Sequence, residues 1–251
     1  MKKRIIPVQL LRDGRLVKTT AFEGGRDVGD PIKSAGVYNS QQADELVFLN
    51  IAREERSIAP LVRVIEDVSR VSFMPLAIGG GIRSADDAAT LIRTGADKVV
   101  INSAAYRDLA VVRATADAFG AQAVVAGIDA RVQGDDYALY SDCGRRLEDV
   151  TLEAHVARLA EAGAGEILIQ SIDRDGTMTG YDLALVDRVM AVARVPVIAA
   201  GGSGDYRHLA ELFGATDVAA AACGSLFNFT DSNPMRAKAF LTNQGFRFKV
   251  V

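Results

Sequence analysis

The stretch MPLAIGGG at residues 74–81 recurs as VPVIAAGG at residues 195–202, which is 121 positions later (195 − 74). Each copy is a short apolar run that begins after a proline and ends in glycines, the pattern of a buried strand followed by a tight turn. Glu45-Leu46 and Glu166-Ile167 are separated by the same offset. A near-constant offset across several apolar runs predicts a chain built from two similar halves.

Similar apolar runs recur along the rest of the chain, with helical patterns between them. We expect eight strands: Arg4–Leu11, Glu45–Ile51, Pro75–Gly79, Lys98–Asn102, Ala123–Asp129, Glu166–Gln170, Pro196–Ala199 and Asp217–Ala221. Eight buried strands that alternate with helices predict an α/β fold, a (βα)₈ TIM barrel made of two (βα)₄ halves. Expected helix starts are Asp30-Pro31, Asn233-Pro234 and Ser84, which has Asp87 three residues on. No linker separates the halves, so residues 1–251 are expected to form a single domain.

The composition excludes several classes of protein. Of the 251 residues 49% are hydrophobic, the formal net charge is −3 and the pI is near 5.5. This acidic balance argues against nucleic-acid binding. No run approaches the roughly 18 apolar residues that a membrane span needs, so we expect no membrane partner and a cytoplasmic location. Cys143 and Cys223 lack metal-binding or redox spacing and are expected to be reduced structural thiols.

Glycines and a small hydroxyl follow the strands in each half, where barrels of this kind carry their chemistry. The first half offers Gly79–Gly81 and Asn102-Ser103, and the second offers Gly201-Gly202 and Gly224-Ser225. Glycine allows the backbone to approach an anion closely, and N–H groups at a helix start can bind it. A single glycine pair is equally explained by a tight turn. Its occurrence twice, half a barrel apart, predicts two phosphate sites and a long ligand with an anionic group at each end.

One acid is a catalytic candidate. Asp129 ends a predicted strand, where a carboxylate is placed for proton transfer, although it could also cap a helix or brace a loop. Asp175-Gly176 follows another strand and is expected at the same mouth, although Asp-Gly alone indicates a turn. His155 and His208 fall in predicted helices and are expected on the surface. Histidine-based catalysis is therefore not expected.

Four charged residues lie at or near the starts of predicted strands, at the opposite end of the barrel: Arg4, Glu45, Lys98 and Glu166. If they point inward, they form a neutral ring of mixed sign, and buried charges persist only when they are paired. The residues alone favour a stabilising role, because this end of such barrels usually serves stability.

Together these motifs resemble the cyclase subunit of imidazole glycerol phosphate synthase over nearly the whole chain. The resemblance is carried by segments that include Arg4–Pro7, Asp13–Lys18, Ala43–Leu49, Gly79–Arg83, Gly95–Val99, Ile101–Ala105, Gly163–Leu168, Asp173–Thr177 and Gly180–Asp182. It implies an enzyme that closes an imidazole ring with ammonia from a glutaminase partner, without a metal or an organic cofactor.

The resemblance also implies roles for individual residues. Phosphate binding is implied at Gly81, Asn102 and Ser103 on one side, and at Asp175, Gly176, Gly202, Gly224 and Ser225 on the other. The four charged residues match an ammonia gate, which we then prefer to a purely stabilising role. Asp97 matches a position in the interface with the glutaminase.

The departures from the family pattern concern catalysis. The pattern Ile-Ile-Pro-Cys-Leu-Asp-Val reads Ile5-Ile6-Pro7-Val8-Gln9-Leu10-Leu11 here, so leucine replaces a catalytic aspartate, while Asp129 retains the second one. Asn50 replaces a further acid, and Gln170 stands where threonine is usual. Leucine transfers no proton, and removal of a general acid or base typically costs about 10²–10⁴ in rate. Leu10 therefore argues against ordinary cyclase activity.

A branch of the family that accompanies surface-polysaccharide genes also has leucine at this position, and it resembles this chain in Leu16–Thr19, Val28–Ile32 and Gly224–Phe227. That likeness implies amidination of a phosphorylated or nucleotide-activated sugar, from acetamido to acetamidino, with Asp129 as the main acid or base. Lys18, Asn50 and Gln170 would contact the anionic substrate. Two alternatives stay open: a genuine cyclase of histidine biosynthesis that tolerates Leu10, and a non-catalytic barrel that activates a glutaminase.

Overall fold

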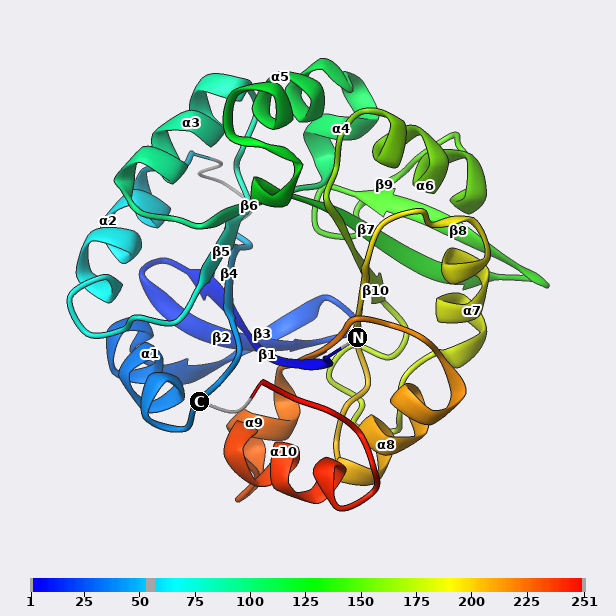
Figure 1. Cartoon of the computed structure of the whole chain (residues 1–251). Coiled ribbons are helices and arrows are strands. Elements are labelled where there is room, and N and C mark those ends of the chain that lie inside the picture. The colour runs from blue at the N-terminus through cyan, green and yellow to red at the C-terminus, as the bar shows by residue number, and fades with distance from the viewer. Residues whose placement is uncertain (1, 53–56, 250–251) are drawn as a thin grey trace.

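The computed structural model describes residues 2–52 and 57–249. The barrel strands in this part of the chain are β1 (Arg4–Arg12), β4 (Leu46–Asn50), β5 (Leu76–Gly79), β6 (Lys98–Ile101), β7 (Val124–Gln133), β10 (Glu166–Ser171), β11 (Val197–Ala200) and β12 (Ala220–Cys223). They are parallel and pair in the order β10-β11-β12-β1-β4-β5-β6-β7, and β7 pairs with β10 to close the circle. Figure 1 looks along this closed barrel, with the helices as an outer ring. The predicted (βα)₈ barrel is confirmed.

The helices that cover the barrel are α1 (Pro31–Ser40), α2 (Ala59–Val68), α3 (Ala85–Thr94), α4 (Ser103–Arg107), α5 (Ala110–Phe119), α6 (Leu152–Glu161), α7 (Leu183–Val192), α8 (Tyr206–Ala215), α9 (Ser225–Phe229) and α10 (Pro234–Thr242), with one 3₁₀ turn at Ala121–Ala123. The three predicted starts are confirmed: Asp30 and Asn233 cap α1 and α10, and Ser84 forms a capping box with Asp87 at α3. Among the described residues, no helix has the length and hydrophobicity needed to cross a bilayer.

The two halves match element by element. β5 and β11 each have four residues and lie 121 positions apart (197 − 76). The short helices α4 and α9 each have five residues and lie 122 positions apart (225 − 103). The sequence repeat is therefore a structural repeat, and it places equivalent groups on opposite sides of the mouth.

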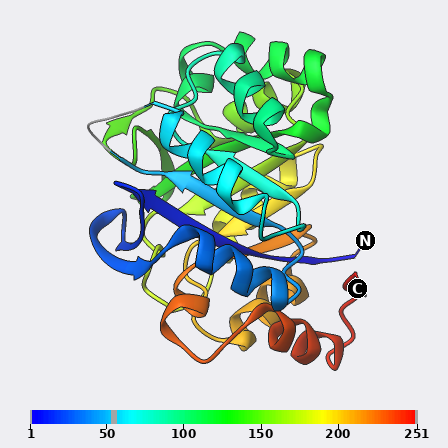
Figure 2. The ribbon, with the colours of Figure 1, turned by 90° about the vertical axis from the view of Figure 1, so that its left-hand side faces the viewer.

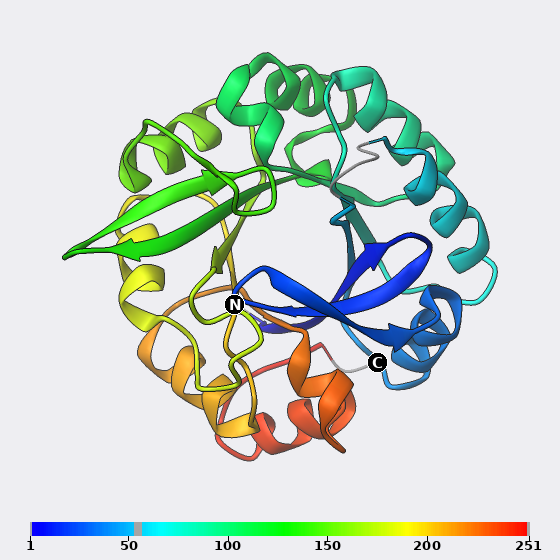
Figure 3. The same ribbon diagram turned by 180° about the vertical axis from the view of Figure 1, so that it is seen from behind.

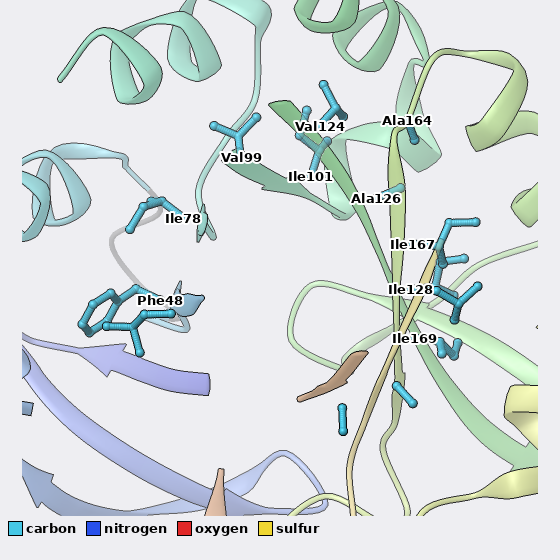
Figure 4. Packing of buried hydrophobic residues seen from close by; sticks show 14 of the residues in the cluster. Phe48, Ile78, Val99, Ile101, Val124, Ala126, Ile128, Ala164, Ile167 and Ile169 are labelled. Carbon is cyan, nitrogen blue, oxygen red and sulfur yellow. The ribbon is translucent and has the colours of Figure 1, made fainter. Parts of the chain in front are cut away.

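Alternation along each strand separates two apolar cores. Residues that point into the barrel, including Ile6, Val47, Val100, Val125 and Leu168, form the lumen core. Their neighbours along the strands point outward and pack beneath the helices, as Figure 4 shows for residues such as Phe48, Ile101, Ile128 and Ile167. The two-residue period of a strand thus decides which side chains reach the lumen.

Two hairpins extend the barrel and were not predicted. β1 turns at Asp13-Gly14 into β2 (Arg15–Thr20) and β3 (Glu23–Gly29), and β7 turns at Gly134-Asp135 into β8 (Asp136–Ser141) and β9 (Arg146–Leu147). Both lie at the end of the barrel away from the two chain termini (Figures 2 and 3). Asp13 and Gly14 both have positive φ, 52° and 73°, as a two-residue hairpin turn requires.

Two predicted strand boundaries were wrong for reasons of pairing. The last strand begins at Ala220 and not at Asp217, because pairing with both β1 and β11 begins there. The fifth barrel strand continues beyond Asp129 to Gln133, because β8 pairs with this extension.

Candidate active site

A cavity of about 570 Å³ lies at the carboxyl ends of the barrel strands. The predicted residues that line it are Lys18, Asn50, Gly81, Asn102, Ser103, Asp129, Gln170, Asp175, Gly176, Gly202, Gly224 and Ser225. Its volume is within the usual range for pockets that bind small molecules. The structure therefore brings both glycine-hydroxyl groups and the candidate acid to one site.

We call the two glycine-hydroxyl groups cradles: Gly79–Gly81 with Asn102 and Ser103 form the first cradle, and Gly201-Gly202 with Gly224 and Ser225 form the second. The glycine turns of both cradles occupy backbone conformations that other residues rarely adopt. Gly80 and Gly81 have φ of 90° and 84°, and Gly201 and Gly202 have φ of 95° and 101°. A Cβ on Gly80 would lie 2.1 Å from the Asn50 carbonyl oxygen, and one on Gly202 would lie 2.0 Å from a neighbouring carbonyl oxygen. Both the backbone conformation and the lack of space therefore require glycine at these positions. This requirement does not distinguish a tight turn from an anion site, because both predict it.

The starts of α4 and α9 distinguish these sites from plain turns. Ser103 and Ser225 are the first residues of these helices, and no described side chain caps either start. Ser103 Oγ accepts a hydrogen bond from the backbone N–H of Asp142 at 3.1 Å, which fixes its position beside the cavity. Each glycine turn therefore faces a small hydroxyl and uncapped helix N–H groups, which together can bind a phosphate.

Asp129 lies between the cradles, on the inward face of β7. Its Oδ2 accepts a hydrogen bond from Asn102 Nδ2 at 2.9 Å. Burial raises the pKa of Asp129 to about 7, although the Asn102 amide favours the charged form. A carboxyl group with a pKa near neutrality can both release and accept a proton under physiological conditions. The Asn102 side chain therefore orients the Asp129 carboxyl group by this hydrogen bond.

Asp175 ties the second cradle to the β2–β3 hairpin. Its Oδ2 accepts hydrogen bonds from Thr19 Oγ1 at 2.7 Å and from the Phe22 N–H at 3.3 Å. Its Oδ1 accepts one from Gln170 Nε2 at 3.3 Å. Burial raises the pKa of Asp175, and these donors and Lys18 oppose that rise. Asp175 and Gln170 thus position the hairpin at the mouth.

Lys18 supplies a cation to the second cradle. Its side chain is 7% exposed, and its Nζ donates a hydrogen bond to the Val8 carbonyl oxygen at 2.9 Å. A Cβ on Gly224 would lie 2.2 Å from this Nζ, so the lysine lies directly against the cradle. Burial lowers the pKa of Lys18 to about 8, with Asp175 acting in the opposite sense. An anionic ligand here would raise the pKa of Lys18 again and favour its charged form.

The wall opposite Asp129 is apolar. Leu10 on β1 and Leu49 on β4 are partners in register and pack on the lumen core. Asn50 has the opposite orientation: its Oδ1 accepts a hydrogen bond from the Ala52 N–H at 3.1 Å, and its Nδ2 donates one to Ser57 O at 3.4 Å. The Asn50 side chain thus braces the loop after β4. No proton-transfer group replaces Leu10 on these two strands within the cavity.

The four charged residues form a closed ring at the floor of the lumen. Arg4 pairs with Glu45 at 3.0 Å and with Glu166, and Lys98 Nζ lies 2.7 Å from a carboxylate oxygen of each acid. Burial raises the pKa of Glu45. For Glu166 burial acts in the same sense, but the hydrogen bonds and charges of Arg4 and Lys98 together outweigh it, and the pKa is lowered. The inward orientation that the sequence suggested is confirmed, and each cation bridges both acids.

Asp97 lies beside this floor. It is exposed, and its Oδ2 accepts a hydrogen bond from the Leu76 N–H at 2.8 Å, at the start of β5. This places Asp97 on the outer face of the ring end, where a partner protein has access to it. Its place in a partner interface stays a prediction.

The prediction for His155 was wrong. This residue is 1% exposed and stacks on Tyr106 with ring centroids 4.0 Å apart. It shares the buried face of α6 with Leu152, Val156 and Leu159, a helical spacing that the sequence contained. Burial lowers the pKa of His155 to about 4. His208 is half-buried and accepts a hydrogen bond from the Gly204 N–H at its Nδ1. Neither histidine lines the cavity.

Comparison with known proteins assigns the barrel to a class. A family model described as "Histidine biosynthesis protein" matches residues 4–232, and the chain belongs to this family. Proteins named "Imidazole glycerol phosphate synthase subunit HisF" are similar over nearly their whole length. The protein from Staphylococcus carnosus is 39% identical over 247 residues, covering 98% of this chain and 97% of the relative. The one from Bacillus cereus strain Q1 is 42% identical over 244 residues, with 97% of each covered.

Within this class the chain is HisF-like: it is an enzyme subunit of the imidazole glycerol phosphate synthase type. These relatives favour the cyclase alternative over the amidination that Leu10 suggested.

Proposed function

We propose that this chain is the ammonia-consuming cyclase subunit of an imidazole glycerol phosphate synthase and works with a glutaminase partner. The observation that carries the proposal is one cavity with a glycine cradle on each side, Asp129 between them and the charged ring beneath the same lumen. A substrate with a phosphate at each end spans the mouth, and ammonia arrives through the floor.

The lumen suits neutral ammonia. Between the charged ring and the mouth it is lined by apolar side chains such as Val47, Val100, Val125 and Leu168. Ammonium would lose its hydration there without a counter-charge, whereas neutral ammonia loses much less. The ring separates this apolar space from the outer face, where Asp97 and a glutaminase would meet.

The chain's own residues then have distinct tasks. The two cradles and Lys18 hold the phosphates and fix the substrate across the mouth. Asp129, oriented by Asn102, moves the protons that ring closure requires. The β2–β3 hairpin, which donates hydrogen bonds to Asp175, limits access of water to the site.

Steady-state kinetics with ammonium salt test this proposal without the partner. The purified chain is expected to convert the doubly phosphorylated cyclase precursor to imidazole glycerol phosphate and to restore growth of a histidine auxotroph lacking the cyclase. Absence of turnover by folded protein, together with failure to complement, would overturn the cyclase assignment.

A second function is favoured by one observation, the apolar wall formed by Leu10 and Leu49. Amidination of an acetamido sugar would use this wall to contact the methyl group of the acyl chain, while ammonia nitrogen replaces the acyl oxygen, which leaves as water. It predicts acetamidino product in the presence of the partner and glutamine, with no turnover of the cyclase precursor. Mass spectrometry of the two reactions distinguishes the two functions.

A further inference from the structure

The cavity at the mouth extends outward beyond the first cradle. Its lining continues from Ser103 past the end of α4 to the first turns of α3 and α5. We call this extension the side groove and define it by Arg83, Ala85, Arg107, Ala110, Val111 and Ala114. A substrate with one phosphate at each end lies between the cradles and leaves this space unused.

Small side chains on α5 keep the side groove open. Val111 is 7% exposed and forms its floor, whereas Ala110 and Ala114 are exposed and four residues apart on the helix. α3 lies beside α5 and contacts it (Figure 1). Ala85 of α3 lines the same cavity. A longer side chain at position 114 would project into the groove from the helix surface.

The charges at the entrance of the groove favour a second phosphate. Arg107 lines the cavity next to the first cradle, and Lys18 contacts the second cradle. Among the described residues that line the groove entrance, the acid is Asp108, and its Oδ1 accepts a hydrogen bond from the Ala110 N–H at 2.8 Å. A phosphate in the first cradle would therefore have room beyond it, and the Arg107 cation, for a second phosphate.

We propose that the first cradle and the side groove together bind a nucleoside diphosphate group. Its pyrophosphate lies across Ser103 and Arg107, and its nucleoside lies against Val111 between the alanines. The proposal rests on the proposed function only in that the first cradle binds phosphate. Nucleoside diphosphates would then compete with any substrate whose terminal phosphate binds in the first cradle.

Calorimetric titration of the intact chain tests the proposal with four probes: inorganic phosphate, ribose 5-phosphate, uridine diphosphate and geranyl diphosphate. We expect uridine diphosphate to bind at least about tenfold more tightly than ribose 5-phosphate, a gain of about 1.4 kcal/mol. Ala114→Leu, which fills the groove, and Arg107→Ala are each expected to remove most of this gain. Ala118→Leu is the matched control, because Ala118 is an exposed alanine of the same helix outside the cavity.

The outcomes separate the two proposals. Equal affinity for uridine diphosphate and ribose 5-phosphate would overturn the nucleotide site and leave the cyclase intact. Unchanged uridine diphosphate binding by Ala114→Leu would also overturn it. Tighter binding of geranyl diphosphate than of uridine diphosphate would reject the nucleoside in favour of an apolar tail. If none of the phosphates binds, the paired cradles of the proposed function fail as well.

Discussion

At the scale of single residues, the site concentrates its chemistry on Asp129. The carboxyl group faces Asn102 on one side and an apolar wall containing Leu10 and Leu49 on the other. Burial that raises its pKa to about 7 also makes the ionised form unfavourable in the folded protein. The burial that suits Asp129 to proton transfer therefore lowers the stability of the folded protein when Asp129 is ionised. Substitution of Asp129 can measure both effects.

Asp129→Asn is expected to lower ammonia-dependent turnover by about 10²–10⁴-fold, because asparagine keeps the size but not the proton transfer. Stimulation of a glutaminase partner should be unchanged. Single-turnover kinetics and glutaminase assays measure the two effects. Normal turnover by the variant would remove Asp129 from catalysis, and loss of both activities would indicate misfolding, which circular dichroism checks.

The same substitution tests the linkage between pH and stability. A folded-state pKa raised from 3.8 to about 7 means that Asp129 contributes stability at low pH, and that this contribution is lost as the pH rises through 7. Asp129→Asn should therefore be more stable than the wild type at pH 8, by on the order of 2 kcal/mol, with a smaller difference at pH 5. Urea unfolding at the two pH values measures this, and an equal difference at both would contradict it.

Leu10→Asp tests the other wall of the site. A carboxylate at this position would add a second proton-transfer group across the lumen from Asp129. We expect ammonia-dependent cyclisation to increase at least about tenfold. Leu10→Asn is the matched control, since it introduces a polar group without proton transfer. An equal increase in both variants would attribute the effect to polarity alone.

At the scale of elements, strand alternation and the repeat made the barrel predictable. The offset that relates residues 74–81 to 195–202 is the offset between β5 and β11, and residues four strands apart therefore face each other across the mouth. The ring was likewise predictable, because Glu166 and Leu168 share the inward face of β10.

The hairpins were missed although Asp13-Gly14 is a hairpin signal. A barrel needs no extra strands, and β3 has no alternation of apolar residues: five of its seven positions are exposed. The bracing role of Asn50 depends on contacts with the following loop, which the sequence does not specify. His155 is buried because it shares the apolar face of α6 with Leu152, Val156 and Leu159, and this helical spacing is visible in the sequence.

Thr19→Val tests the link between the β2–β3 hairpin and Asp175. Loss of the 2.7 Å hydrogen bond should destabilise the hairpin by about 1 kcal/mol and raise KM more than it changes kcat. Hydrogen exchange of the hairpin amides and substrate-dependent kinetics report the two effects. Unchanged exchange and KM would show that the hydrogen bond does not hold the hairpin over the site.

At the scale of the whole molecule, the candidate site and the charged ring lie at opposite ends of the barrel, separated by the length of the lumen. Both hairpins lie at one end of the barrel and the chain termini at the other (Figure 2). The two glycine-hydroxyl cradles occupy the end with the hairpins, and the charged ring occupies the end with the termini. The lumen core joins them. In the proposed function ammonia therefore crosses the molecule from the partner's side to the substrate's side without entering bulk water.

Lys98→Met tests this passage. It removes a cation that bridges Glu45 and Glu166, and leaving these buried acids with one cation should cost on the order of 3 kcal/mol of stability. Glutamine-dependent turnover should change relative to ammonia-dependent turnover, because only the former uses the floor. Arg15→Ala, which breaks an exposed ion pair with Asp27, is the control and should leave the ratio unchanged. An unchanged ratio in Lys98→Met would assign the ring to stability alone.

The most direct test of a doubly anionic substrate is a crystal structure of the chain soaked in phosphate. The account predicts two bound anions, one at Gly81 and Ser103 and the other at Gly202 and Ser225. Crystals whose mouth is open to solvent and that show no anion at either position would contradict it.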